Sequence, residues 1–247
     1  MVAIRKAAII TGGAKGIGRA IALRLATDDI NIVVADMDLV NAKKVLKEIY
    51  QMNQRGIAVK VDVSKPVQVK KMVKAAIDTF KRVDILVNNA SICYGTDIPD
   101  LEEKEWDRVI DVNLKGTFLC CQTVYSIMKE QKQGRIINIA SLAGQTAALL
   151  AGAHYAASKA GQIALTKLLA KKMASFGVTV NSVSPACIRT DMLFSNFTEE
   201  QLNRISVPVG RFGEPWEVAE VVAFLVSEKA GFINGAVYNV NGGLFMD

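Results

Sequence analysis

The sequence has one histidine and four cysteines, and no two cysteines are spaced as CxxC. Zinc sites are built from closely spaced Cys and His ligands, so this scarcity argues against a metal centre. The cysteines are Cys93, Cys120, Cys121 and Cys187, and adjacent cysteines rarely pair with each other. We therefore expect no metal and four reduced thiols, as is typical of a cytoplasmic protein.

Long apolar segments and clustered basic residues are also missing. The apolar run in the opening stretch MVAIRKAAIITGG is too short for the apolar region of a signal peptide. Residues 136–158 carry no charge, but Asn138, Gln145 and other polar residues interrupt them, which argues against a membrane helix. The net charge is +6, yet Lys and Arg are spread along the chain without interleaved aromatics. Neither a membrane nor a nucleic acid is therefore expected as a partner.

Short apolar runs alternate with longer amphipathic stretches. The runs predict strands at residues 6–11, 31–36, 57–63, 83–89, 134–141, 178–184 and 236–242. The stretches predict helices near residues 16–28, 38–54, 66–80, 101–130, 155–175 and 214–228. The strands are mostly uninterrupted apolar runs, which indicates burial on both faces. The repetition predicts an α/β, Rossmann-type doubly wound fold, with a seven-stranded parallel sheet and helices on both faces.

No linker or low-complexity segment divides the chain, so residues 1–247 are expected to form a single domain. Residues 186–212 are less regular and contain Pro208 and Gly210. Long loops after strands often cover substrate sites, so this segment is predicted to be a substrate flap.

A glycine-rich turn joins the first predicted strand to the first helix. Gly12, Gly16 and Gly18 follow the spacing TGxxxGxG within TGGAKGIG. Glycine allows a tight turn, close approach of the backbone to a pyrophosphate, and tight helix–strand packing. The N–H groups at the helix start then bind the phosphate. The turn predicts an NAD(P)-binding domain, although a plain turn is the alternative on this motif alone.

Asp36 ends the second predicted strand, 18 residues after Gly18. A carboxylate at this place accepts hydrogen bonds from the adenosine ribose and repels a 2′-phosphate. Lys15 is the opposing signal, because its charge would attract a 2′-phosphate, but Met37 rather than an arginine follows Asp36. NAD(H) is therefore favoured over NADP(H), with an ordinary turn aspartate as the alternative.

The stretch HYAASKAGQ places Tyr155 and Lys159 one helical turn apart, on one face. The charge of Lys159, together with that of an oxidised nicotinamide, is expected to lower the pKa of the phenol, ordinarily about 10, and so to suit it for proton exchange. Ser141 lies at the carboxyl end of a predicted strand, where ligands bind in open sheets. Asn113 lies in a helical pattern that disfavours asparagine, which indicates a role other than packing, or a local kink.

Together these motifs resemble the short-chain dehydrogenase/reductase family over essentially the whole chain. The resemblance rests on TGxxxGIG at 11–18, NNAS at 88–91, Asn113, Ser141, and Tyr155 with Lys159. Ser91 stands where the family usually has glycine. The C-terminal stretch VPVGRFGEPWEVAEVVAFLV looks most like the subgroup of 3-oxoacyl-[acyl-carrier-protein] reductases and related alcohol and sugar dehydrogenases. The resemblance implies an oxidoreductase acting on CH–OH/C=O groups.

The resemblance also implies roles for particular residues. Ser141 would polarise the substrate carbonyl, Tyr155 would exchange its proton, and Lys159 would bind the nicotinamide ribose. Asn113 would complete a proton relay through water. The implied cofactor contacts are Gly12, Lys15, Gly16, Ile17, Gly18, Asp36, Asp62, Val63, Asn89, Ala90, Tyr155, Lys159, Ile188 and Thr190.

Within that set, Asp62 and Val63 would contact the adenine, and Ile188 and Thr190 would hold the nicotinamide carboxamide. Ala186 stands where the family usually has glycine. If the turn there needs a positive φ, alanine would strain it, and the contacts on the nicotinamide side would suffer.

Three hypotheses follow. The first is an NAD(H)-dependent cytoplasmic enzyme that interconverts a secondary alcohol and a ketone, with Tyr155 as acid/base. The second is a 3-oxoacyl-[acyl-carrier-protein] reductase of fatty acid synthesis, which would use NADPH. The basic pI of 9.1 supports it, and Asp36 stands against it. A remote third is a non-catalytic dinucleotide-sensing module, which has no need for Asn113, Ser141, Tyr155 and Lys159 together.

The expected partners follow from these hypotheses. The substrate is a small carbonyl or alcohol, with an acyl carrier protein as a further partner under the second hypothesis. That acidic carrier would dock on Lys129, Lys132, Lys171 and Lys172. The family resemblance implies a homotetramer, packed through the helices near 101–130 and 155–175 and through the C-terminal strand.

Overall fold

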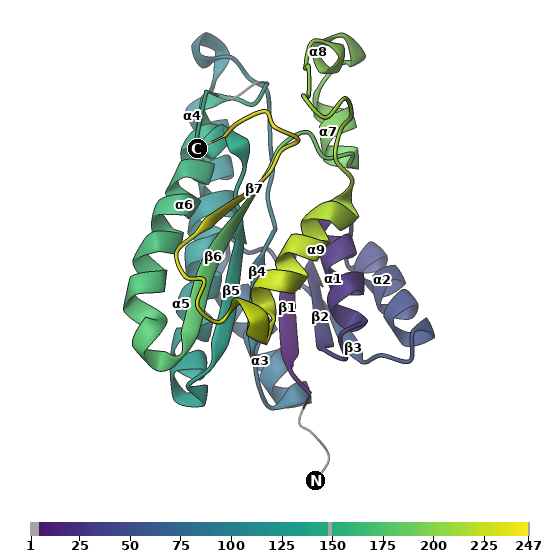
Figure 1. The fold of residues 1–247 in the computed structure, drawn as a ribbon, viewed down its shortest axis with the longest axis vertical. Helices are drawn as coiled ribbons and strands as arrows, with labels where there is room; N and C mark the ends of the chain where they lie inside the picture. The colour runs from purple at the N-terminus through teal and green to yellow at the C-terminus, as the bar shows by residue number, and fades with distance from the viewer. Residues whose placement is uncertain (1–4, 148–149, 247) are drawn as a thin grey trace.

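The computed structural model describes residues 5–147 and 150–246. Seven parallel strands form one sheet in the order β3-β2-β1-β4-β5-β6-β7. The strands are β1 (Ala7–Thr11), β2 (Asn31–Asp36), β3 (Gly56–Lys60), β4 (Ile85–Asn88), β5 (Gly134–Ile139), β6 (Val178–Pro185) and β7 (Val237–Val240). The helices are α1 (Gly16–Ala26), α2 (Leu39–Gln51), α3 (Pro66–Phe80), α4 (Glu103–Ile110), α5 (Gly116–Gln131), α6 (Ala153–Met173), α7 (Asp191–Asn196), α8 (Glu199–Asn203) and α9 (Pro215–Val226). The predicted Rossmann-type doubly wound fold is confirmed (Figure 1).

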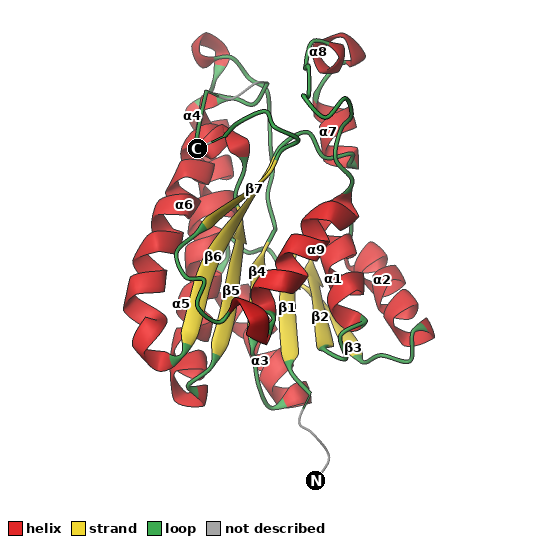
Figure 2. Ribbon diagram, in the orientation of Figure 1, coloured by secondary structure: helices red, strands yellow, loops and turns green. Residues whose placement is uncertain are grey.

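Alternate residues of the central strand β1 face opposite helical layers. Ala8 and Ile10 pack with α1, α2 and α9, whereas Ile9 packs with α3, α5 and α6. Figure 2 shows the two groups of helices with the sheet between them. Because water reaches neither face, the strands read as apolar runs without polar alternation.

The order of the strands reverses beside β1. The chain adds β2 and β3 on one side of β1, and β4 to β7 on the other. The loops that follow β1 and β4 therefore leave the sheet in opposite directions, and a crevice opens between them at the carboxyl edge. This position brings the glycine-rich turn and the residues after β4 together.

The predicted helix at 101–130 consists of two helices joined by a wider turn. A π-helical turn over Asp111–Lys115 separates α4 from α5, with Asn113 at its centre. Asn113 therefore lies where the helix changes from α to π and back. Short helices α7 and α8 occupy the irregular segment 186–212, where five or six residues are too few to give a helical period.

Several strands are shorter than predicted, β3 and β4 among them. The strand predicted at 57–63 ends at Lys60, and the one predicted at 83–89 spans only Ile85–Asn88. After Lys60 the chain turns, because the Asp62 carboxylate accepts hydrogen bonds from the backbone and side chain of Ser64. Such a turn competes with the sheet ladder for the backbone.

The uncharged segment 136–158 does not form one element. It divides between β5, a short turn at Leu142–Gly144 and the start of α6. In the ranges that the structure describes, no helix is both long and apolar enough to cross a bilayer.

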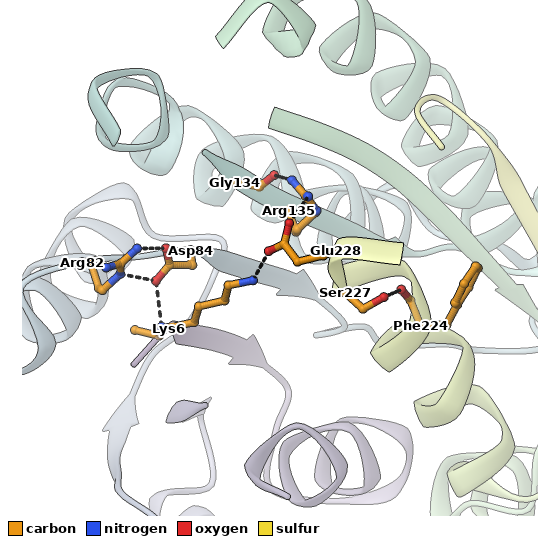
Figure 3. Close-up of polar contacts among 9 residues, drawn as sticks. Lys6, Arg82, Asp84, Gly134, Arg135, Phe224, Ser227 and Glu228 are labelled. Atoms are coloured by element: carbon orange, nitrogen blue, oxygen red, sulfur yellow. Dashed lines mark hydrogen bonds and ion pairs between the residues drawn. The ribbon is translucent and has the colours of Figure 1, made fainter. Parts of the chain in front are cut away.

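Asp84 ties the amino end of β4 to β1 (Figure 3). Its carboxylate is 2% exposed and accepts a hydrogen bond of 2.9 Å from the backbone N–H of Ala7. The guanidinium of Arg82 donates two more, each of 2.6 Å. Beside it, the carboxylate of Glu228 pairs with the ammonium of Lys6, the residue just before β1. The same carboxylate lies 3.8 Å from the guanidinium of Arg135 in β5. These charges hold the starts of three elements together.

We expect Asp84→Ala to lower the free energy of unfolding by about 2 to 3 kcal/mol, because it leaves a buried N–H and a guanidinium without their acceptor. Urea-induced unfolding measures the change. The matched control is Asp78→Ala, which breaks an exposed ion pair with Lys74 and should cost no more than about 0.5 kcal/mol. Equal losses from the two variants would contradict the assignment.

Candidate active site

A cavity of about 480 Å³ lies at the carboxyl edge of the sheet. Most residues that the sequence singled out line it, drawn from loops far apart in the chain. They are Gly12, Lys15, Gly16, Ile17, Asp36, Asp62, Val63, Asn89, Ala90, Ser141, Tyr155, Lys159, Ile188 and Thr190. Gly18 and Asn113 were also predicted, but they are not among the lining residues.

The glycine-rich turn has the form that a pyrophosphate site requires. Gly12 has a φ of +63°, and a Cβ on it would lie 2.8 Å from Cα of Ala90. A Cβ on Gly18 would lie 2.0 Å from the carbonyl oxygen of Gly12, so Gly18 acts by letting α1 pack against the turn. Lys15 at the start of α1 gives the helix no side-chain cap, and the first N–H groups stay available to an anion. The turn therefore fits a dinucleotide.

Asp36 is held in place by the same turn. Its Oδ2 accepts from the N–H of Ala14 at 3.0 Å, and its Oδ1 from the N–H of Asp38 at 2.9 Å. The Lys15 ammonium lies 3.1 Å from the Asp38 carboxylate. The cation that would attract a 2′-phosphate is thus already paired.

Ser141, Tyr155 and Lys159 meet at the opposite end of the cavity. Ser141 follows β5, and its Oγ accepts a hydrogen bond of 3.2 Å from the N–H of Ala143. Lys159 is 2% exposed, and its Nζ donates to the carbonyl oxygen of Ile139 at 2.8 Å. The same Nζ lies 5.4 Å from the centre of the Tyr155 ring. The strand end and the helix start therefore converge as the sequence predicted.

Burial alters the proton affinity of both groups. It lowers the pKa of Lys159 to about 7. It raises the pKa of Tyr155 above its ordinary value, as does the nearby Cys93, and the neighbouring hydroxyls of Ser141 and Ser91 act in the opposite direction. Among the protein groups alone, withdrawal from water penalises the phenolate more than its neighbours favour it, so they do not lower the pKa of Tyr155. The lowering expected from Lys159 together with oxidised nicotinamide stays a prediction.

Asn113 lies behind the cavity wall, where it bridges the loop after β4 and helix α6. Its Oδ1 accepts from the N–H of Ile92, and its Nδ2 donates to the carbonyl of Ile92, both at 2.9 Å. Nδ2 also donates to Ser158 Oγ at 3.1 Å. The Asn113 carbonyl accepts from Thr117 Oγ1 at 2.7 Å and from Gln162 Nε2 at 2.9 Å. The proton relay through Asn113 stays a prediction.

A buried polar network that the sequence reading missed continues behind the same wall. Asn88 Nδ2 donates to Asn138 Oδ1, and Asn138 Nδ2 donates to Thr166 Oγ1, each at 2.8 Å. Thr166 Oγ1 in turn donates to the carbonyl of Gln162 at 2.8 Å. The sequence does contain a signal for this network, because an asparagine stands inside each of two otherwise apolar strands. A buried side-chain amide needs hydrogen-bond partners.

The cavity becomes apolar beyond Ser141 and Tyr155. Side chains there come from the loops after β4 and β5 and from the segment 186–212: Cys93, Leu142, Leu150, Leu193, Phe197 and Ile205. Within the described ranges, no group of three His, Cys, Asp or Glu side chains is arranged to hold a metal ion. The substrate end thus suits an apolar substituent next to the reacting carbonyl.

The turn after β6 differs from the expectation for Ala186. The residue with a left-handed conformation is Cys187, whose φ is +52°, and Ala186 has no positive φ. The strain therefore falls one residue later than predicted. Cys187 also accepts, through its carbonyl oxygen, the N–H of Gly213 at 3.1 Å, while Ile188 and Gly213 form an isolated parallel bridge.

The glycine turn, the strand-end carboxylate and the Ser–Tyr–Lys group define a dinucleotide-binding oxidoreductase of the Rossmann class. A family model described as short chain dehydrogenase matches residues 6–201. The chain belongs to the short-chain dehydrogenase family, and it is an oxidoreductase acting on CH–OH/C=O groups.

Relatives cover the chain from end to end. It is 42% identical to "3-oxoacyl-[acyl-carrier-protein] reductase FabG" of Staphylococcus epidermidis, over 98% of this chain and 100% of the relative. Among solved structures, levodione reductase superposes with a TM-score of 0.91 at 31% identity, covering 96% of both chains. A 3-oxoacyl-[acyl-carrier protein] reductase with bound NAD from Brucella melitensis gives a TM-score of 0.89 at 32% identity, covering 99% of this chain and 94% of that one.

The lowered pKa of Lys159 has a consequence for stability. Between about pH 7 and 10.5, the folded and ordinary values, the unfolded chain holds a proton on Lys159 that the folded chain has released. Stability should therefore rise with pH across this window. We expect Lys159→Met to flatten the rise, as measured by melting temperature against pH.

The control for this experiment is Lys167→Met, which removes an exposed lysine from the same helix and should leave the pH dependence as it is. Identical slopes in the wild type and in Lys159→Met would show that Lys159 keeps its proton throughout the window.

Proposed function

We propose that the chain reduces the ketone of a 3-oxoacyl thioester to the 3-hydroxyacyl thioester. The observation that carries the proposal is the single cavity shared by Asp36, Ser141, Tyr155 and Lys159. The full-length similarity to a protein named 3-oxoacyl-[acyl-carrier-protein] reductase supports the choice of substrate. The proposal takes its substrate from the second of the sequence-based hypotheses, and it keeps the cofactor NAD(H) of the first.

Tyr155 is proposed as the proton donor and Ser141 as the group that polarises the carbonyl. A bound nicotinamide dinucleotide supplies the hydride. Because burial raises the pKa of Tyr155, the phenol keeps its proton at neutral pH and is ready to give it to the alkoxide oxygen. The Ser141 oxygen accepts from the N–H of Ala143, which leaves the Ser141 hydrogen to turn from the Tyr155 oxygen to the substrate carbonyl once a substrate is bound.

Lys159 and Asn113 are proposed to set the geometry of this reaction. Lys159 uses one hydrogen on the carbonyl of Ile139, and its remaining hydrogens are proposed to hold the nicotinamide ribose. Asn113 clamps Ile92 and reaches Ser158 on α6. We propose it as a positioning residue for the loop after β4.

We propose NAD(H) as the preferred cofactor. Asp36 stands where the adenosine ribose is expected, and its fixed carboxylate accepts from hydroxyls but repels a 2′-phosphate. The pairing of Lys15 with Asp38 adds to this preference. The related Brucella melitensis reductase, whose structure has bound NAD, supports it as well.

An acyl carrier protein is proposed as the partner that presents the substrate, but not through the lysines that the sequence suggested. Lys129 and Lys132 lie at the end of α5, and Lys171 and Lys172 in the last turn of α6. Both helices end beside the amino edge of the sheet, opposite the cavity (Figure 1). These charges therefore do not flank the cavity of their own chain.

A second candidate is reduction of a free cyclic or aliphatic ketone. The similarity in fold to levodione reductase favours it, and so does the apolar substrate end of the cavity. Both candidates use the same proposed roles for Ser141 and Tyr155, and they differ only in the group attached to the ketone.

The deciding experiment is a kinetic panel read by the absorbance of reduced nicotinamide. We expect kcat/KM for a 3-oxoacyl thioester on acyl carrier protein to exceed that for free ketones by at least about tenfold, a difference of about 1.4 kcal/mol. Free ketones turning over faster would favour the second candidate. Tyr155→Phe should lose nearly all turnover, and normal turnover in that variant would end the proposed mechanism.

The same panel, run with NADH and NADPH, tests the cofactor preference. We expect the wild type to favour NADH and Asp36→Ala to reduce that preference by about tenfold, because the ribose acceptor and the repulsion are both lost. Asp28→Ala, an exposed change remote from the cavity, serves as the control. A wild type that prefers NADPH would overturn the role given to Asp36.

We also propose a cytoplasmic homotetramer. The four cysteines are free thiols, which suits a reducing compartment. Exposed apolar side chains lie on two separate surfaces: Phe118 and Leu168 on α5 and α6, and Phe224 and Phe232 near α9 and the approach to β7. Such side chains are typical of contact surfaces. Light scattering on the purified protein should give four times the chain mass, and a monomer would contradict the tetramer.

A further inference from the structure

Ser91 is a hydroxyl residue of the cavity wall that none of the proposed steps uses. It follows β4 at the position where glycine is usual in the family. Its Oγ is shielded from solvent and makes no hydrogen bond of ordinary distance and angle with another described residue. A buried hydroxyl without a partner costs free energy, so this oxygen is suited to a partner that forms during the reaction.

The backbone on each side of Ser91 is fixed. The N–H of Ala90 donates to Thr11 Oγ1 at 3.1 Å. The N–H and carbonyl of Ile92 are both bound by the side-chain amide of Asn113, at 2.9 Å each. Ser91 therefore cannot drift away from the wall, and its hydroxyl is preorganised.

Ser91 acts on the same phenol as Ser141. Both hydroxyls lie near the phenol oxygen and favour its ionised form, which lowers the pKa of Tyr155, although burial and Cys93 outweigh them. Ser141 and Ser91 come from the loops after β5 and β4, neighbouring strands of the sheet. The phenol oxygen thus has hydroxyl neighbours from two loops.

The two hydroxyls have different duties once a carbonyl substrate is present. Ser141 has a single hydrogen, and under the proposed mechanism it donates that hydrogen to the substrate carbonyl. It then has none left for Tyr155. Ser91 has no other hydrogen-bond partner among the described residues, so its hydrogen remains available to the phenol oxygen.

We propose that Ser91 is a further catalytic residue, whose hydroxyl donates a hydrogen bond to the Tyr155 oxygen and stabilises the phenolate formed in the reaction. The O–H bond of Tyr155 breaks and a new O–H bond forms on the substrate alkoxide, while Ser91 keeps its own proton. Hydrogen bonds to an ionised oxygen are stronger than those to a neutral one, so this contact strengthens as the proton leaves. The inference rests on the proposed role of Tyr155 as acid/base.

Other titratable groups also face the phenol, and they must be the same in every variant compared. They are the Cys93 thiol two residues along the same loop and the Lys159 ammonium on α6. The Asp191 carboxyl at the start of α7 lines the same cavity and must also stay unchanged. None of them changes when only the hydroxyl of Ser91 is removed.

The test is Ser91→Ala, assayed in both directions with the 3-oxoacyl and 3-hydroxyacyl thioesters. We expect kcat to fall by about tenfold with KM nearly unchanged, because the lost contact is made mainly in the transition state. In the oxidation direction, the rise of rate with pH should move to higher pH by about one unit, since the phenolate loses a donor. Ser91→Thr, which keeps a hydroxyl, should restore most of the loss.

Ser91→Gly removes the same hydroxyl without adding any atom, and it should repeat the result if the alanine variant is poorly folded. Ser126→Ala, an exposed serine on α5, is the matched control and should behave as the wild type. A wild-type pH profile and kcat in both Ser91→Ala and Ser91→Gly would overturn the proposal. If Tyr155→Phe also retained turnover, the proposed function would fail as well, and the two failures are thus distinguished.

Discussion

The side-chain amide of Asn113 is the contact on which the geometry of the cavity depends. It binds the backbone of Ile92 in both directions and reaches Ser158, whose hydroxyl donates to the carbonyl of Tyr155 at 2.7 Å. One amide thus fixes the loop after β4 relative to the first turn of α6. Asn113 stands in the π-helical turn, whose ring is wider than that of an α-helix. Its backbone carbonyl accepts from Gln162 Nε2 and Thr117 Oγ1, so the backbone of Asn113 is held as well as its side chain. Catalytic groups on separate elements keep their spacing because a buried residue between them is fully engaged.

The second constraint is the removal of water from Tyr155 and Lys159. Burying an ammonium opposes folding, and the lowered pKa of Lys159 is the sign of that cost. The carbonyl of Ile139 and the face of the Tyr155 ring offset part of it. The burial of Lys159 and Tyr155 lowers the stability of the fold, but it also keeps water from screening the interactions between these two groups. Such a compromise between stability and activity is common at active sites.

Much of the fold was readable because both faces of the sheet are covered. Where strand and helix alternate, an apolar run such as NIVVAD indicates a buried parallel strand. A glycine-rich turn that is followed by a helix indicates a dinucleotide-binding turn. Side-chain chemistry that depends on burial was not readable. The direction of the Tyr155 pKa needed the depth of the site, and the partners of Asn113 needed the width of the turn around it. The short helices α7 and α8 were not predicted because six residues or fewer carry no helical period. The burial of the Ser91 oxygen depends on the folded loop and could not be predicted from the NNAS motif.

The bridge between Ile188 and Gly213 joins the chain as it leaves the sheet for α7 and α8 with the chain as it returns. Arg189 strengthens this junction, since its N–H donates to the carbonyl of Gly213 at 2.8 Å. The segment between Ile188 and Gly213 is therefore a long loop whose two ends are held together beside the sheet. Substitutions at Leu193, Phe197 or Ile205 can therefore change which ketones are accepted. The sheet and the proton-transfer groups stay as they are. Substrate selectivity and proton transfer therefore depend on separate parts of one chain, which can change independently in evolution.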